Sequence, residues 1–346
     1  MSYAPVSAPV RILLYVFATI IVGALLLAAA AGWGIKYYNA PGPGEAPVTV
    51  IIPKGTGFTQ ITEMLATQGV IRYPGVFRVI GVVLEKSGHA QPGEYEFPAQ
   101  VSPKTVLDWL AAGKTVIHRI TIPEGWTTLQ IMDYLQQNDK LEGQVSSDIQ
   151  EGELLPETYH FSRGDQRSEI IARMRRGMRD VLNEYWEKRD PSVPFRTPQE
   201  ALTMASIVEK ETGIDSEYGT VASVYINRLR LGMLLQADPT VIYAVTRGKA
   251  ALGRSITKAD LKMESPYNTY VTVGLPPGPI ANPGRKALQA TLNPSKTDYI
   301  FFVANGSGGH NFSSSLEDHN KNVKEFRAHI KANAAKKAAA SAAPKK

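Results

Sequence analysis

The chain of 346 residues contains no cysteine. This absence excludes structural disulfides, thiolate metal sites, cysteine nucleophiles and an anchor formed by attaching lipid to cysteine. The sequence also lacks a His-Glu-x-x-His string or any other cluster of metal ligands at a recognised spacing. It therefore predicts no metal and no cofactor.

Outside the carboxyl-terminal end, the chain has almost no excess of positive over negative charge. The formal net charge is +6, but residues 331–346 hold five lysines and no acidic residue, which leaves +1 for the rest of the chain. A basic footprint for nucleic acid is therefore not indicated. The Lys/Ala-rich segment itself is typical of a disordered, solvated tail.

Long apolar runs are confined to one place, residues 12–35. This run carries no charge and exceeds the roughly 20 residues that a helix needs to cross a bilayer. It therefore predicts a transmembrane helix. A cleaved signal peptide is the alternative, because the alanines at 28–31 resemble a small-residue cleavage site.

The charges beside the apolar run barely decide its orientation. Only Arg11 precedes it closely and only Lys36 follows it closely. The short leader at residues 1–11 favours a cytoplasmic amino terminus, with the remainder of the chain outside the cytoplasm. Three aromatic side chains suit the outer membrane interface: Trp33, Tyr37 and Tyr38.

Proline and glycine mark residues 36–47 as a linker. A strand pattern, a Pro-x-Gly turn and an amphipathic helix pattern follow at residues 48–65, and the same order recurs at residues 119–135. This order resembles LysM-like modules, which in many proteins hold glycans containing N-acetylglucosamine. We therefore predict a LysM-like region with an internal repeat over residues 48–150. The alternative is that both repeats are packing units.

Longer helix patterns separated by loops rich in glycine and proline begin near residue 151. A short aromatic and β-branched run at residues 299–303 predicts a buried strand. We therefore predict an α+β fold with a transmembrane helix, a LysM-like region and a mixed helical/β catalytic domain at residues 151–330.

One predicted helix ends with two glutamates. Thr197 suits its N-cap, Pro198 its first position, and Glu200 closes a capping box. The helix is apolar almost all round, as expected of a helix inside a core. Glu209 and Glu211 fall on nearly opposite faces near its end, so they do not form one paired site. Burial raises the pKa of either carboxyl toward the range of a general acid, and helix geometry does not choose between them.

Four strings in this region resemble the MltG (YceG-like) family of endolytic murein transglycosylases. They are residues 151–159, 204–213, 227–233 and 235–243. The resemblance implies that the first glutamate of the Val-Glu-Lys-Glu-Thr string, Glu209, is catalytic. Glu211 then makes a structural contact.

The resemblance implies a lyase that cleaves the MurNAc-β-1,4-GlcNAc bond of nascent glycan strands and leaves 1,6-anhydroMurNAc ends, which terminates elongation. One glutamate suffices, because the 6-hydroxyl of the muramic acid is the nucleophile. A hydrolytic muramidase is the alternative and needs a second acid, for which Asp238, Glu157 and Asp215 are candidates. A non-catalytic, membrane-anchored peptidoglycan-binding scaffold is the other alternative.

The implied partners are peptidoglycan strands, the bacterial inner membrane and, as candidates, peptidoglycan synthases and division proteins. The implied groove around Glu209 is lined by residues from several segments. The substrate-binding candidates are Asn227, Gln236, Asp238, Tyr243, Asn268 and His310. Each has an ordinary alternative role, as a hydrogen-bonding group inside the domain or a turn-stabilising side chain.

Overall fold

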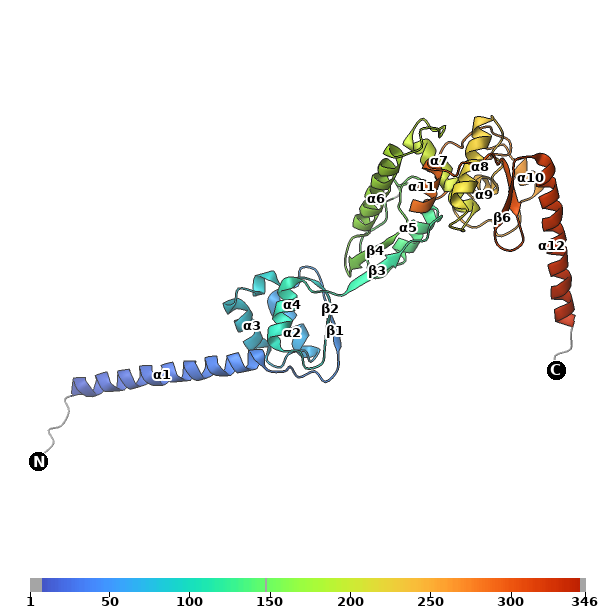
Figure 1. Cartoon of the computed structure of the whole chain (residues 1–346). Coiled ribbons are helices and arrows are strands. Elements are labelled where there is room, and N and C mark those ends of the chain that lie inside the picture. The colour runs from blue at the N-terminus through green and yellow to red at the C-terminus, as the bar shows by residue number, and fades with distance from the viewer. Residues whose placement is uncertain (1–7, 147, 343–346) are drawn as a thin grey trace, which may run out of the picture. The chain divides into compact units, whose positions relative to one another are not determined.

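The computed structural model describes residues 8–146 and 148–342. The first seven residues of the predicted cytoplasmic segment and the last four of the predicted tail lie outside the described residues. Helices and strands are mixed, as the α+β prediction requires. The chain forms two compact units (Figure 1). Unit 1 extends to His118 and includes residues 162–164, and unit 2 contains residues 119–161 and everything from Asp165 onward.

The predicted membrane-spanning run lies inside the first helix, α1 (Ala8–Asn39). Within the described residues, α1 is the one helix that is long and apolar enough to cross a membrane, and none of its most apolar window is buried. It is compatible with a single-pass anchor near the amino terminus.

Unit 1 contains a two-stranded antiparallel sheet formed by β1 (Val48–Ile52) and β2 (Gly93–Phe97). Alternate residues of both strands point into one apolar core, because successive side chains of a strand face opposite sides. The helices of this unit are α2 (Phe58–Thr67), α3 (Pro74–Val83), the short η1 (Ser87–His89) and α4 (Pro103–Ala112). Two of them, α2 and α3, lie between the strands in sequence, which gives a β-α-α-β order.

The end of α1 is attached firmly to this unit. Tyr38 packs against the core of unit 1. The Gly42 N–H donates to the Gln100 carbonyl at 3.2 Å, and the Gln100 N–H donates to the Gly44 carbonyl at 2.7 Å. The segment from residue 36 to 47, predicted as a linker, is therefore partly helical and partly hydrogen-bonded to the folded unit.

The next elements are β3 (Ile117–Thr121), α5 (Thr128–Gln136), β4 (Thr158–Ser162) and α6 (Arg167–Glu187). They belong to unit 2, except for residues 117–118 of β3 and Ser162 of β4. β3 and β4 form a second two-stranded sheet. The apolar side chains of β3 and α5 share one core with residues beyond 150, including Leu154 and Ile170. The second strand-turn-helix segment therefore packs with the helical part of the chain.

The rest of unit 2 is built on α7 (Pro198–Glu211), α8 (Tyr218–Arg230) and α11 (Arg285–Leu292), and α11 packs against the other two. The smaller helices are α9 (Asp238–Thr246) and α10 (Lys258–Leu261). The strands β5 (Phe301–Ala304) and β6 (His310–Ser313) form an antiparallel hairpin, and β5 is partly buried rather than fully buried as predicted.

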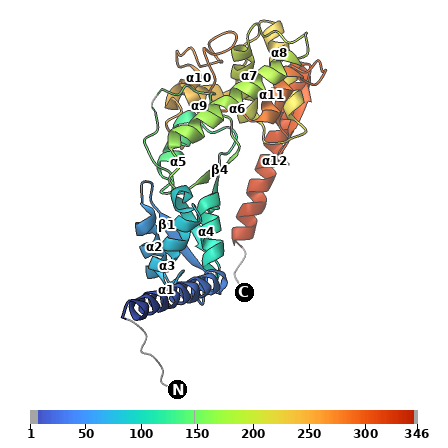
Figure 2. The same cartoon turned by 90° about the vertical axis from the view of Figure 1, so that its left-hand side faces the viewer.

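The last helix, α12 (Leu316–Ala342), packs on the hairpin and then extends away from the other helices of unit 2 (Figures 1 and 2). Its final turns contain residues 331–342, which belong to the segment predicted as a disordered tail. Alanine and lysine are strong helix formers, so this composition also supports a helix.

The helix α7 begins and packs as its sequence predicts, apart from its capping box. The Thr197 hydroxyl accepts a hydrogen bond from the Glu200 N–H at 3.2 Å, and Pro198 takes the first position. Residues 201–208 are all buried. The Glu200 carboxylate, however, accepts from the Arg196 N–H at 2.6 Å. It therefore satisfies the donor one residue before the N-cap and does not close the predicted box.

Candidate active site

The side chain of Glu209 is held by two donors from different elements. One carboxylate oxygen accepts a hydrogen bond from the Tyr218 hydroxyl on α8 at 3.0 Å. The other accepts from the backbone N–H of Gly284, the N-cap of α11, at 2.9 Å. These contacts fix the position of a partly buried carboxyl at the point where α7, α8 and α11 meet.

The pKa of Glu209 is raised from 4.5 to about 7. Burial is the main cause, because a low-dielectric surrounding disfavours the charged form. The Gly284 N–H, the Tyr218 hydroxyl and Lys210 act in the opposite direction, since each stabilises the carboxylate. The result is a carboxyl that both donates and accepts a proton near neutral pH.

A second carboxylate, Glu124, lies beside Glu209, and the sequence analysis did not identify it. Its negative charge contributes to the raised pKa of Glu209. Glu124 covers Gly284 so closely that a Cβ at that position would overlap its carboxyl group. A side chain at position 284 would therefore push the exposed Glu124 carboxyl group out of its present position beside Glu209. The sequence does contain a signal, the Pro-Glu-Gly turn of residues 123–125. Because this turn is part of the strand-turn-helix repeat, the pattern indicates a structural place for its glutamate and no catalytic role.

Asn282 joins the loops that carry Gly284 and Glu124. It is fully buried. Its side-chain oxygen accepts from the Leu154 N–H at 2.9 Å, and its amide nitrogen donates to Trp126, Thr128 and Glu151. Its backbone carbonyl accepts from the Gly125 N–H at 3.0 Å. The side chain and backbone of this one residue therefore fasten residues 125–128 and 151–154 to the segment that ends at Gly284.

Glu211 also has a pKa raised to about 7, again mainly by burial. Its carboxylate accepts a hydrogen bond from the buried Tyr225 hydroxyl at 2.7 Å. Asp238 raises the pKa and Arg228 lowers it, so this carboxyl lies in a different set of groups from Glu209. The two glutamates have separate partners, as their opposite helix faces predict.

Two of the predicted substrate-binding residues, Gln236 and Asp238, lie at and just before the start of α9, and the charge of Asp238 acts on Glu211. Asp238 is exposed and accepts a hydrogen bond from the Tyr270 hydroxyl at 2.6 Å. Gln236 is also exposed, and its φ of 53° places a residue other than glycine in the left-handed region. Such strained backbone often marks functional sites.

Tyr243 and Asn268 have different environments. Tyr243 packs on Tyr267, with ring centroids 4.9 Å apart, and interacts with the Glu151 carboxylate that Asn282 also contacts. Asn268 is fully buried, and its amide nitrogen donates to the backbone carbonyls of Asp260, Leu261 and Met263. These bonds hold the loop after α10, which is the turn-stabilising alternative for this residue.

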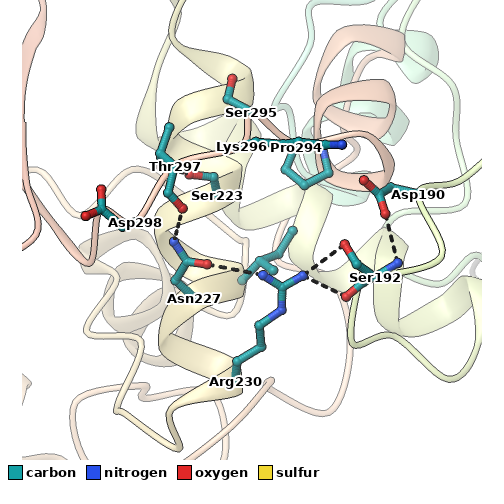
Figure 3. A pocket seen from close by; sticks show the side chains of 11 residues that line it. Asp190, Ser192, Ser223, Asn227, Arg230, Pro294, Ser295, Lys296, Thr297 and Asp298 are labelled. Carbon is teal, nitrogen blue, oxygen red and sulfur yellow. Dashed lines mark hydrogen bonds between the residues drawn. The ribbon is translucent and has the colours of Figure 1, made fainter.

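Asn227 lines a polar cavity of about 470 Å³, and Glu209 is not among the residues that form its wall. In Figure 3, the Asn227 side chain points from α8 toward Thr297, and the Arg230 side chain points toward Ser192. The Asn227 amide donates to the carbonyls of Thr297 and Tyr299, and Arg230 donates to Ser192. Asn227 therefore ties α8 to the segment leading into β5.

His310 is bound to Glu217, the residue before Tyr218. Its backbone N–H and its Nδ1 contact the two oxygens of that carboxylate at 2.9 and 2.7 Å. Burial alone raises the pKa of Glu217, but the His310 contacts outweigh it and lower the pKa. His310 therefore braces the start of α8, from which the Tyr218 hydroxyl reaches Glu209.

The other predicted second acids form ion pairs at the start of α11. Glu157 contacts the Arg285 guanidinium at 2.5 Å, and Asp215 contacts the Lys286 ammonium at 2.6 Å. All four side chains are substantially exposed. Glu124 is therefore the carboxylate that the structure places beside Glu209, in preference to the three candidates from the sequence.

Comparison with known proteins gives consistent matches over most of the chain. The model of the YceG-like family matches residues 50–325. An endolytic murein transglycosylase of Bacillus subtilis (strain 168) is 31% identical over 315 residues, which cover 82% of this chain and 85% of the relative. An endolytic murein transglycosylase of Streptococcus pneumoniae (strain D39) is 28% identical and covers 80% of this chain, which spans 58% of that relative. A solved yceG-like protein of Listeria monocytogenes is 31% identical and covers 80% of this chain and 99% of its own, with a TM-score of 0.46.

Proposed function

The chain belongs to the YceG-like family, and from this premise we propose that it is an endolytic murein transglycosylase, a lyase acting on peptidoglycan. The observation that carries the proposal is the Glu209 carboxyl, with its pKa of about 7 and its two fixed donors. The proposed bond is the MurNAc-β-1,4-GlcNAc linkage of a nascent strand. The proposed outcome is an end to strand elongation.

In the proposed first step, protonated Glu209 donates its proton to the glycosidic oxygen as the bond to the muramic acid breaks. The leaving sugar carries that proton as a new hydroxyl. The carboxylate that remains is stabilised by the Tyr218 hydroxyl and the Gly284 N–H. In the second step, Glu209 accepts the proton of the muramic acid 6-hydroxyl while that oxygen bonds to the anomeric carbon. The 1,6-anhydro end forms without water.

Glu124 supports a second candidate, the hydrolytic muramidase. Hydrolysis of a glycoside usually requires two carboxyl groups, and Glu124 supplies one beside Glu209. We favour the lyase because Glu124 already has a role that needs no water, which is to raise the pKa of Glu209. The products of the reaction distinguish the two candidates.

The proposal extends to the rest of the chain. The β-α-α-β order of unit 1 supports a LysM-like module that contacts glycan. α1 would anchor the protein in the inner membrane, with the amino terminus in the cytoplasm and the folded units outside it. Gln236, Asp238 and Tyr243 would contact substrate, since the first two are exposed and the third is only partly buried. Asn227, Asn268 and His310 would support the fold.

The test is mass spectrometry of glycan fragments after incubation of peptidoglycan with the protein. The full chain in detergent is used, because the end of α1 is part of unit 1. We expect fragments with 1,6-anhydroMurNAc ends. Reducing muramic acid ends would establish the hydrolase instead, and the absence of any cleavage would favour the non-catalytic scaffold.

The pH dependence of cleavage is expected to follow Glu209. The acid step needs the protonated form, so the rate falls as the pH rises through about 7. Tyr218→Phe removes a donor to the carboxylate and raises the pKa, which moves this fall to higher pH. Glu124→Gln removes a negative charge and lowers the pKa, which moves it to lower pH. Initial rates measured across neutral pH check both. Shifts in the same direction would contradict the assignment.

A further inference from the structure

The helix α3 exposes an unusually apolar face. Its ten residues contain one charged side chain, Arg78. Val79 is 61% exposed, Val82 is 58% exposed and Val83 is 73% exposed, and Leu84 follows at 45%. Contiguous exposed apolar surface of this kind marks an interaction site in a soluble domain. The opposite side of the helix, with Phe77 and Gly81, is buried in the core of unit 1.

This apolar face continues onto α1. An apolar groove of about 670 Å³ lies between the two helices. Figures 1 and 2 both show α3 beside the end of α1 that joins unit 1. The groove is lined on the α1 side by residues between Leu27 and Tyr38 and on the α3 side by residues between Gly75 and Leu84.

The place of the groove along α1 sets its depth in a membrane. The apolar run of residues 12–35 is about 36 Å long as a helix, which is slightly more than the hydrocarbon thickness of a bilayer. The groove begins at Leu27, so it borders the half of this run nearest unit 1. With α1 across a bilayer, the α3 wall of the groove would lie at the level of the acyl chains in one leaflet.

The residues at the edge of this apolar face are of the kinds found at a membrane interface. Trp33, Tyr37 and Tyr73 form one aromatic cluster where α1 meets the start of α3, with ring centroids 5.3 to 6.0 Å apart. Tyrosine and tryptophan favour the headgroup region. By helical geometry Arg78 lies at the edge of the exposed valine arc, where its positive charge suits anionic headgroups.

We propose that the exposed face of α3 is a second membrane contact, inserted among the lipid acyl chains of the leaflet that surrounds the carboxyl-terminal half of α1. This proposal relies on α1 as the anchor and is independent of the reaction that Glu209 performs. Together α1 and α3 hold unit 1 against the bilayer in a fixed orientation. A single spanning helix would leave the unit free to tilt.

The absence of cysteine allows a direct test with single labelling sites in the full chain. Val79→Cys, Ile51→Cys and Val22→Cys each receive an environment-sensitive fluorophore, and the proteins are placed in vesicles of phosphatidylethanolamine and phosphatidylglycerol. Ile51 is the matched control, because it is an apolar residue of unit 1 with 45% exposure on β1. Val22 lies within α1 and reports insertion of the anchor.

We expect lipids brominated on their acyl chains to quench the probes at residues 79 and 22, and aqueous iodide to quench only the probe at residue 51. Iodide quenching at residue 79 equal to that at residue 51 would overturn the proposal. Protection of residue 79 from both quenchers would also overturn it, because a protein would then cover α3. Failure of brominated lipid to reach residue 22 would refute the anchor and the contact together.

Discussion

Glu209→Gln is expected to lower the rate of glycan cleavage by about 10³-fold, since general acid–base catalysis by one positioned group contributes on this order. Glutamine keeps the size of the side chain, and its amide oxygen still accepts one of the hydrogen bonds from Tyr218 and Gly284. It does not donate a proton to the glycosidic oxygen or remove one from the 6-hydroxyl. Single-turnover rates on isolated glycan strands measure the loss.

Glu211→Gln is the matched control for this result. Glu211 lies on the same helix and has a pKa raised to about 7 in the same way, but its carboxylate contacts Tyr225 and faces a different set of groups. We expect this variant to keep most of its activity. Equal losses in the two variants, with thermal unfolding unchanged, would contradict the assignment of Glu209 as the only acid and base.

Glu209 and Glu211 show which features of the site can be predicted from the sequence. Helical geometry separated Glu209 from Glu211 correctly, because the angle between side chains depends only on their spacing along α7. It did not rank them, since burial raises the pKa of both carboxyls to a similar extent. The groups that distinguish them, Gly284 and Tyr225, come from other segments.

Glu124 shows why contacts between distant segments cannot be predicted from the sequence alone. It lies 85 positions before Glu209 in the chain. Two contacts bring it to Glu209: Asn282 fastens residues 125–128 to the segment before α11, and the Lys210 ammonium on α7 donates to the Gly125 carbonyl. No periodicity or local spacing records a contact of this kind. Local chemistry alone made Asp238, Glu157 and Asp215 equally good candidates, and the structure places two of them in exposed ion pairs.

In the fold as well, local elements could be predicted from the sequence, whereas the packing between distant segments could not. Local patterns predicted the start of α7, the strands at residues 48–52 and 119–121, and the helices that follow them. The sequence placed the change of character near residue 151, whereas contacts group residues 119–161 with the helical unit. The reason is that β3 and α5 bury their apolar side chains against residues beyond 150, and such long-range packing has no local signature.

Asn282→Ala is expected to destabilise unit 2 by roughly 3 kcal/mol, because truncation leaves the buried Leu154 N–H without its acceptor and removes a donor to Glu151. The loop that positions Gly284 then keeps its backbone hydrogen bonds to Gly125 and Trp126 but loses the side-chain contacts that fix it to residues 151–154. Gly284 supplies one of the two donors to Glu209, so the folded fraction of the variant should also lose activity. Denaturant unfolding and single-turnover cleavage below the unfolding transition measure the two effects separately.

Asn268→Ala provides a control of equal chemistry. Asn268 is also fully buried, and its amide holds a loop through three carbonyl acceptors. We therefore expect a similar loss of stability. None of its hydrogen bonds leads to Gly284, Glu124 or Glu209, so the folded variant should cleave glycan at nearly the normal rate. Equal loss of activity in both variants would mean that general loosening of unit 2 impairs cleavage, and not the displacement of the Gly284 N–H from Glu209.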